Sequence, residues 1–122
     1  MGIKTGIDLV YLPRFKKALK KGGEKFLRRI YLEKELGHLE GGPGLPRGEI
    51  EHLAGIFAAK EAVIKALGLP VGSWHDIHIG RKSKGAPTVV ISNFELRTSN
   101  FSLSIAHDGD YVIAMFVAVI KK

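Results

Sequence analysis

Polar and apolar residues alternate at the start of the chain, and this period of two predicts a β-strand over residues 3–11. Successive side chains of a strand point to opposite faces. One face is therefore predicted to hold a mostly apolar row, formed by Ile3, Thr5, Ile7, Leu9 and Tyr11. The other face holds Gly6 and Asp8, and Gly6 is expected to leave open space beside the carboxylate.

The pattern changes to helical spacing after this strand. Pro13 suits a first helical turn, and a helix broken at Gly22–Gly23 is predicted from its apolar positions, which are Phe15, Leu19, Phe26 and Ile30. A short helix is predicted over residues 32–39. Residues 41–48 have the sequence GGPGLPRG, which is so rich in Gly and Pro that we expect a loop with no helical residue.

The strongest helical segment covers residues 49–67 and ends at Gly68 and Pro70, which are usual helix stops. Its residues are apolar on nearly all sides, so most of its surface should be buried. Strands are predicted at about 75–80, 87–92, 101–107 and 111–120, the last two joined by a hairpin turn, while residues 93–99 are ambiguous. One long buried helix packed on a mostly antiparallel sheet is an α+β fold.

Composition narrows the class of protein. The chain has 122 residues, 45% hydrophobic and 25% charged, so one domain over residues 1–122 is expected. It contains no cysteine, which excludes disulfides, a thiolate nucleophile and cysteine-ligated metal centres. The longest apolar run, residues 111–120, is shorter than the roughly 20 residues that a membrane helix needs. We therefore expect no membrane segment and a cytoplasmic location.

The positive charge is concentrated in one segment. Between residues 14 and 34 there are nine basic and two acidic side chains, a net charge of +7, which equals the formal net charge of the whole chain. The rest of the chain is therefore neutral. A basic segment of this kind attracts a negatively charged partner such as a nucleic acid, an anionic lipid or an acidic protein.

Two acidic residues occupy positions that disfavour a charge. Asp8 interrupts the first predicted strand, and Glu61 lies in the most apolar part of the long helix, FAAKEAVIKALG. Burying an unpaired carboxylate costs several kcal/mol, roughly. Glu61 could pair with Lys65 one helical turn later, and Asp8 could be bonded within a turn. Alternatively, the two carboxylates could together hold a magnesium ion that serves a phosphate substrate, with Lys65 near the phosphate.

Three histidines are candidates for a functional or metal-binding site. His107 ends a predicted strand at a turn, a place where side chains are often functional and often merely solvated. His75 and His78 have an odd spacing, which on a strand places them on opposite faces, so a shared zinc ion is not expected. The chain has neither a P-loop pattern nor a Gly-x-Ser-x-Gly elbow.

The chain resembles the holo-acyl-carrier-protein synthases, the small bacterial type of 4′-phosphopantetheinyl transferase. The resemblance covers nearly the whole chain, and FAAKEA-x-x-KA-x-G after a Gly-x-Asp strand is its most specific part. The matching segments are GIDLVYLPRF at 6–15, KFLRRIYLEKEL at 25–36, FAAKEAVIKALG at 57–68, WHDIHI at 74–79, GAP at 85–87 and LSIAHDGDYVIA at 103–114. The family commonly continues Gly-Thr-Gly after the long helix, whereas residues 68–72 here are GLPVG.

The resemblance implies the 4′-phosphopantetheinyl transferase fold and a reaction that serves fatty acid biosynthesis. In it, 4′-phosphopantetheine passes from coenzyme A to a serine of apo-acyl carrier protein, and adenosine 3′,5′-bisphosphate is released. By resemblance, Asp8 and Glu61 are the magnesium ligands and Lys65 contacts the phosphates and protonates the leaving group. Glu61, directly or through a water molecule, is the candidate base. The nucleotide would be held by Gly68, the turn 85–87 with Pro87, and His107.

The resemblance also implies two kinds of protein partner. Acyl carrier proteins are acidic, so the basic segment suits docking by charge around one apolar anchor, and the implied contacts are Arg14, Phe26 and Arg29. The family forms a homotrimer with nucleotide sites at the subunit interfaces.

Two other functions are compatible with parts of the sequence. The basic segment and its interleaved aromatic residues could bind nucleic acid, but this leaves Asp8 and Glu61 unexplained. A carrier-binding subunit without activity would retain the fold, but both carboxylates and Lys65 are present. We therefore predict an enzyme with coenzyme A and carrier protein as partners, and neither a membrane nor a nucleic acid.

Overall fold

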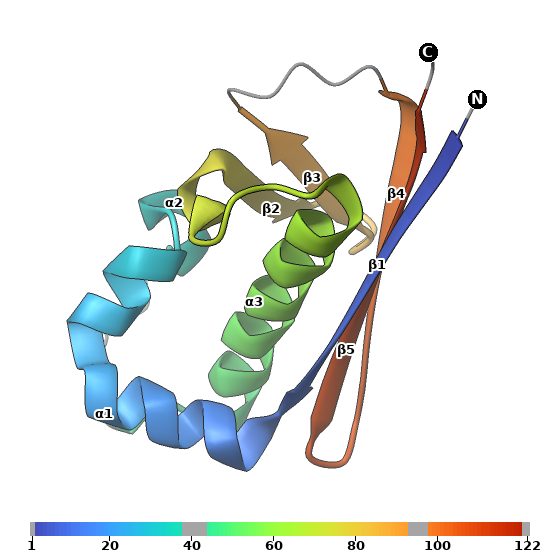
Figure 1. The fold of residues 1–122 in the computed structure, drawn as a ribbon. Helices are drawn as coiled ribbons and strands as arrows, with labels where there is room; N and C mark the ends of the chain where they lie inside the picture. Colours follow the sequence, from blue (N-terminus) through green and yellow to red (C-terminus); the bar gives the residue numbers. More distant parts are fainter. Residues whose placement is uncertain (1, 38–43, 93–97, 121–122) are drawn as a thin grey trace.

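The computed structural model describes residues 2–37, 44–92 and 98–120. Five strands, three α-helices and a short 3-10 helix follow one another along these residues (Figure 1). Their order is β1 (Gly2–Tyr11), α1 (Leu12–Ile30), α2 (Glu33–Leu36), α3 (Arg47–Leu67), η1 (Ser73–Asp76), β2 (Ile77–Arg81), β3 (Pro87–Ile91), β4 (Thr98–Asp108) and β5 (Tyr111–Ile120). The expected α+β class is confirmed.

Long antiparallel strands form the main sheet, in the order β1-β5-β4. The central strand β5 pairs along its whole length with β1, so that Gly2 lies opposite Ile120 and Asp8 opposite Ala114. The predicted hairpin turn joins β4 to β5. Strands β2 and β3 form a separate antiparallel hairpin, and β3 approaches β4 (Figure 1).

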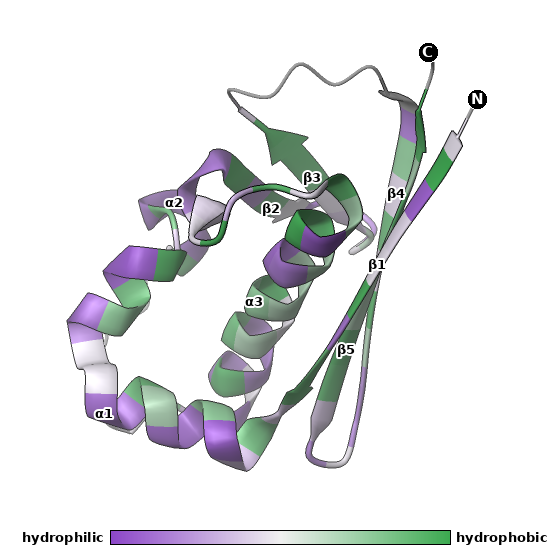
Figure 2. Cartoon of the chain, viewed as in Figure 1, coloured by the Kyte–Doolittle hydropathy of each residue, from purple (hydrophilic) through white to green (hydrophobic). Residues whose placement is uncertain are grey.

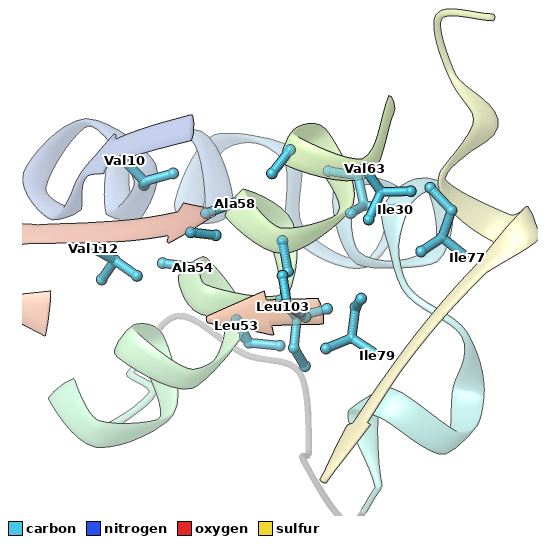
Figure 3. Close-up of a cluster of buried hydrophobic side chains, with 14 of the residues drawn as sticks. Val10, Ile30, Leu53, Ala54, Ala58, Val63, Ile77, Ile79, Leu103 and Val112 are labelled. Carbon is cyan, nitrogen blue, oxygen red and sulfur yellow. The ribbon is translucent and has the colours of Figure 1, made fainter. Parts of the chain in front are cut away.

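Helix α3 packs across one face of the main sheet and forms the centre of the core (Figure 3). Its residues Leu53, Ala58, Ala62 and Val63 have no exposed surface, which confirms the burial predicted from its apolar pattern. Even-numbered residues of β5, from Val112 to Ala118, point toward the helix and are buried. The helix is thus enclosed by the sheet, α1 and the β2–β3 hairpin.

The opposite face of the main sheet carries exposed apolar side chains over β1 and β5. Ile3, Ile7 and Leu9 of β1 are 70%, 56% and 60% exposed, and Met115 of β5 is 47% exposed. The rings of Tyr11 and Tyr111 lie 5.2 Å apart at one end of this face. The apolar sheet face is defined here by six residues: Ile3, Ile7, Leu9, Tyr11, Tyr111 and Met115.

Helix α1 is kinked within the predicted break. Gly23 has φ 56° and ψ −138°, a backbone conformation that glycine tolerates best. At Gly22 a Cβ atom would lie 2.6 Å from the Cβ of Phe26, so the kink also needs a residue without a side chain there. The ring of Phe26 meets that of Phe15 edge to face at 5.8 Å. One side of α1 is buried, and polar residues cover much of the rest (Figure 2).

Several predicted boundaries were wrong. Helix α3 begins at Arg47, within the predicted loop, because the carbonyl of Pro46 accepts hydrogen bonds from Glu49 and Ile50 and starts the first turn. Residues 41–43 of that loop lie outside the described residues. Helix α2 is shorter than the predicted 32–39 and ends at Gly37, which has φ 57°; residues 38 and 39 are not described.

The strands also differ in their starting points. Residues 73–76 form η1, so β2 begins at Ile77 rather than near residue 75. Strand β4 already begins at Thr98, at the end of the stretch that was ambiguous in sequence, and residues 93–97 lie outside the described residues. In the part of the chain that the structure describes, no helix is both long and apolar enough to cross a membrane.

Candidate active site

Gly6 lets β1 approach α3 closely, and this approach positions Asp8. A Cβ atom at Gly6 would lie 1.9 Å from the carbonyl oxygen of Ala62 and 3.0 Å from the backbone nitrogen of Ala66. The expectation of open space beside Gly6 was therefore wrong, because the backbone of α3 fills it. Two residues later on the same face, the Asp8 side chain is only 16% exposed.

Lys65 of α3 bridges the helix and the strand. Its Nζ lies 3.0 Å from Oδ1 of Asp8 and donates to the carbonyl of Ile7 at 3.1 Å. The alternative in which Lys65 pairs with Glu61 along the helix is not what the structure has. The alternative in which Asp8 bonds within a turn is wrong as well, because Asp8 lies in the middle of β1.

Glu61 has a different partner, which the sequence analysis did not identify. The indole Nε1 of Trp74, in η1, donates to Oε1 of Glu61 at 3.2 Å. Both side chains are partly buried. Both carboxylates of the predicted pair therefore accept a hydrogen bond, Asp8 from Lys65 of α3 and Glu61 from Trp74 of η1.

A pocket of about 320 Å³ brings Asp8 and Glu61 together. Arg14 and Phe26 of α1 also line it, so two of the three residues assigned to carrier-protein docking border the predicted chemical site. Its other lining residues are Leu9, Val10, Tyr11, Phe15, Ala18 and Phe57. The pocket therefore combines two carboxylates and one guanidinium with a mostly apolar lining.

The donor set of this pocket fits magnesium. Magnesium is usually held by one or two carboxylates together with water and substrate phosphates. A carboxylate can accept several bonds, so the single contacts to Lys65 and Trp74 leave Asp8 and Glu61 with further acceptor capacity. Among the described residues, no group of three or more His, Cys, Asp and Glu could hold a metal ion by itself. Any ion here would take its remaining ligands from water and substrate.

The residues assigned to the nucleotide do not line this pocket. Gly68 ends α3 in the left-handed conformation at φ 64°. Pro87 starts β3 and lines a separate pocket of about 190 Å³. His107, near the end of β4, is exposed and its Nδ1 lies 3.3 Å from Oε2 of Glu51. Within one chain these three residues are therefore not gathered around Asp8 and Glu61. Arg29, exposed near the end of α1, is also outside this pocket.

The two histidines do not share a strand, as the prediction had assumed. His75 lies in η1 rather than on a strand, and its Nε2 is 2.6 Å from the carbonyl oxygen of Arg28. His78 lies on β2, where burial and the nearby charge of Lys34 lower its pKa below the usual value.

The structure also contains a buried ion pair next to Glu61 in sequence, which the sequence did not predict. Lys60, immediately before Glu61, and Glu35 of α2 have fully buried side chains, with Nζ and Oε1 2.6 Å apart. Burial lowers the pKa of Lys60, while the hydrogen bond and the charge of Glu35 oppose this shift. The position of Lys60 in the most apolar part of α3 could have indicated a buried and therefore paired charge. Its partner could not be identified because it lies on another helix.

The chain matches proteins of known activity along most of its length. The model of the 4′-phosphopantetheinyl transferase superfamily matches residues 4–116. The holo-[acyl-carrier-protein] synthase of Salinispora arenicola is 41% identical over 125 residues, covering 97% of this chain and 98% of that protein. The structure of Helicobacter pylori holo-[acyl-carrier-protein] synthase in complex with coenzyme A has a TM-score of 0.79 at 33% identity, covering 94% of this chain and 99% of the other.

A second solved synthase structure is similar to this chain to the same degree. It is the holo-(acyl-carrier-protein) synthase of Bacillus anthracis in complex with CoA (3′,5′-ADP), with a TM-score of 0.79 at 31% identity, covering 97% of this chain and 96% of the other.

Proposed function

This chain belongs to the holo-[acyl-carrier-protein] synthases of the 4′-phosphopantetheinyl transferase superfamily, and we propose that it acts as such a synthase. It would transfer 4′-phosphopantetheine from coenzyme A to a serine of apo-acyl carrier protein, in a magnesium-dependent reaction. The observation that carries the proposal is the pocket in which β1 and α3 bring Asp8 and Glu61 together, beside Lys65. Residues 1–122 would act as one transferase domain.

Asp8 and Glu61 would hold the magnesium ion. When bound, it supplies positive charge to the pyrophosphate oxygens of coenzyme A as the leaving phosphate accumulates negative charge. Lys65 lies at the edge of the same site, held against β1 by Asp8 and by the carbonyl of Ile7. The Lys65 side chain is about half exposed, so it can reach a phosphate without leaving the site.

The reaction is a displacement at phosphorus. The serine oxygen forms a bond to the phosphorus that bears the pantetheine, and the bond from that phosphorus to the bridging oxygen of the pyrophosphate breaks. Glu61 accepts the serine proton, directly or through a water molecule. Lys65 donates a proton to the leaving phosphate, and adenosine 3′,5′-bisphosphate departs.

The carrier protein would dock on α1. This helix contains most of the basic segment, and its residues Arg14 and Phe26 border the pocket. An acidic protein seated there would therefore bring its serine close to Asp8 and Glu61. Arg29, in the last turn of the same helix, would extend the contact away from the pocket.

A homotrimer would complete the nucleotide site. The apolar sheet face is a large exposed surface of a kind that usually marks an interaction site. His107 lies outside the Asp8 pocket of its own chain, so in an assembly it could instead contact the nucleotide of a neighbouring subunit. Gly68 and Pro87 would contact the nucleotide as well. We place the reaction in the cytoplasm, as a step that serves fatty acid biosynthesis.

Mass spectrometry of apo-acyl carrier protein tests the proposal. After incubation with this protein, coenzyme A and magnesium, the carrier should gain the mass of one phosphopantetheine group, and EDTA should prevent the gain. Asp8→Asn and Glu61→Gln should each reduce the rate by orders of magnitude. Glu49→Gln, the same change at the start of α3, should leave the rate near that of the wild type. No gain of mass under any metal condition would refute the activity.

A further inference from the structure

Trp74 contacts Glu61 from outside the set of residues that line the pocket. Its indole N–H donates to Oε1 of Glu61 at 3.2 Å, and Trp74 is not among the described residues that line the pocket with Asp8. An indole nitrogen can only donate, whereas a carboxylate can accept at both oxygens. The contact therefore occupies one oxygen of the Glu61 carboxylate, and a carboxylate has further acceptor capacity beyond one such bond.

The backbone of Trp74 is anchored independently of its ring. Lys60 Nζ donates to the carbonyl of Trp74 at 3.0 Å and to that of Ile30 at 2.7 Å, and it pairs with Glu35. Because Lys60 and Glu61 are consecutive on α3, the helix holds both ends of Trp74, the carbonyl through Lys60 and the indole through Glu61.

The Glu35 carboxylate is itself fixed by backbone donors. Its Oε1 accepts from the amide of Leu32 at 2.8 Å, and its Oε2 accepts from the amide of Ile79 at 2.8 Å. The ion pair thus connects α2, β2 and α3 to the short helix that contains Trp74. A buried pair of this kind does not by itself favour stability, but it can select one arrangement among several.

We propose that Trp74 is a positioning residue whose indole N–H orients the Glu61 carboxylate toward the divalent cation. The proposal rests on the proposed function in one respect, namely that Glu61 is a ligand of that cation. Hydrogen-bond partners of metal ligands commonly change metal affinity or activity by about 10- to 100-fold when they are removed. A role limited to packing would not alter the response to metal.

Trp74→Phe is the direct test, because it removes the N–H and retains an aromatic ring and the backbone carbonyl that Lys60 contacts. The magnesium concentration for half-maximal transfer should rise about tenfold, with little change in the KM for carrier protein. Ser73→Ala is the matched control. It removes the 2.6 Å hydrogen bond from Ser73 Oγ to the carbonyl of Pro70 in the same short helix, without touching Glu61. This control should leave the magnesium response unchanged.

A binding measurement separates the proposal from the activity. Manganese affinity, measured by water-proton relaxation with adenosine 3′,5′-bisphosphate present, should be about tenfold weaker in Trp74→Phe than in the wild type. If the wild type transfers nothing, the proposed function fails, and this measurement still decides the role of Trp74. Equal affinities, or no manganese binding by the wild type, would overturn the positioning role.

Fluorescence gives a second readout, because Trp74 is the only tryptophan in the chain. Magnesium added with coenzyme A should change the emission of the wild type, and this change should disappear in Glu61→Gln, in which the oriented carboxylate is absent. Equal metal-induced changes in both proteins would contradict the proposal. In the transfer assay, equal losses of the magnesium response in Trp74→Phe and Ser73→Ala would also contradict it, since these would indicate general loosening of the segment.

Discussion

Gly6 determines how close Asp8 lies to α3. A side chain at this position would overlap the carbonyl of Ala62, which is backbone and cannot rotate away. Burying extra atoms in a packed contact typically costs about 1–3 kcal/mol. The glycine therefore sets the separation of strand and helix, and with it the 3.0 Å contact between Asp8 and Lys65.

Gly6→Ala should therefore lower the free energy of unfolding by about 1–3 kcal/mol and reduce transfer, because β1 must move away from α3. Urea denaturation and the transfer assay measure the two effects. Gly2→Ala, on the same strand with nothing within 4 Å of the added Cβ, is the control and should change neither. Wild-type stability in Gly6→Ala would show that the two elements can separate without cost.

Tyr31 is a second residue whose surroundings have a measurable consequence. It is 2% exposed and donates to the carbonyl of Leu53 at 2.6 Å. Burial, and secondarily the negative charge of Glu35, raise the pKa of Tyr31 well above its ordinary value. The folded protein thus retains the phenol proton at a pH at which the unfolded chain, with a pKa of about 10, has lost it.

Stability that depends on the Tyr31 proton should be present below pH 10 and should decrease as the pH rises above 10. Tyr31→Phe removes this dependence, together with a hydrogen bond worth about 1 kcal/mol. The stability difference between wild type and Tyr31→Phe, measured by urea denaturation, should therefore shrink between neutral pH and pH 11. A difference that is constant or grows would show that the phenol ionises freely in the folded state.

Among the elements, α1 has a buried side that packs on the core and an exposed side that carries positive charge. Its buried residues Phe15 and Leu19 attach it to the core, and its basic residues remain exposed. The kink at Gly23 divides the exposed surface into two parts, with Arg14 before it and Arg29 after it. Charges on such a surface mainly accelerate encounter with an oppositely charged partner.

Reversing Arg14 and Arg29 to Glu changes the charge of this helix by four units. The KM for carrier protein should rise by about an order of magnitude at low salt, and its dependence on salt should become flatter. Coenzyme A binding should hardly change. Lys4→Glu with Lys82→Glu makes the same charge change away from α1 and should leave the KM for carrier protein near the wild-type value. Equal losses of coenzyme A and carrier binding would place α1 in the nucleotide site instead.

At the scale of the whole molecule, the main sheet has two unlike faces. One face is covered by α3, and the other is the apolar sheet face, whose residues Ile7 and Met115 are paired across β1 and β5. Covering this face with copies of the same chain would remove apolar area from water, which stabilises an assembly by roughly 25 cal/mol per Å² before the costs of association.

Met115→Glu should therefore convert the proposed trimer to monomers in analytical ultracentrifugation. It should also lower the transfer rate, because a monomer lacks the neighbouring subunit that would complete its nucleotide site. The side chain is 47% exposed in the single chain, so the folded monomer should persist in circular dichroism. Val90→Glu is the control and should remain trimeric, because Val90 is an exposed apolar residue of β3, which belongs to the separate β2–β3 hairpin. A monomeric wild type would refute the assembly itself.

Periodicity along the chain is enough to predict the order of the elements and to single out the two carboxylates. Strand alternation placed Asp8 with Gly6 on one face of β1 and the apolar row on the other, and the apolar pattern of α3 predicted its burial with Glu61. These inferences succeeded because side-chain direction in a strand or helix depends on spacing along the chain, which the sequence states directly. The resemblance then added a function that spacing alone left open.

Which residues contact one another depends instead on how the elements pack. Lys65 pairs with Asp8, 57 residues away, instead of Glu61 in the next turn, and Glu61 receives its hydrogen bond from Trp74. The close contact at Gly6 and the buried pair of Lys60 with Glu35 were likewise invisible in the sequence. Such contacts join separate elements, so they depend on where each chain reversal places the next element, and local periodicity contains no information about that placement.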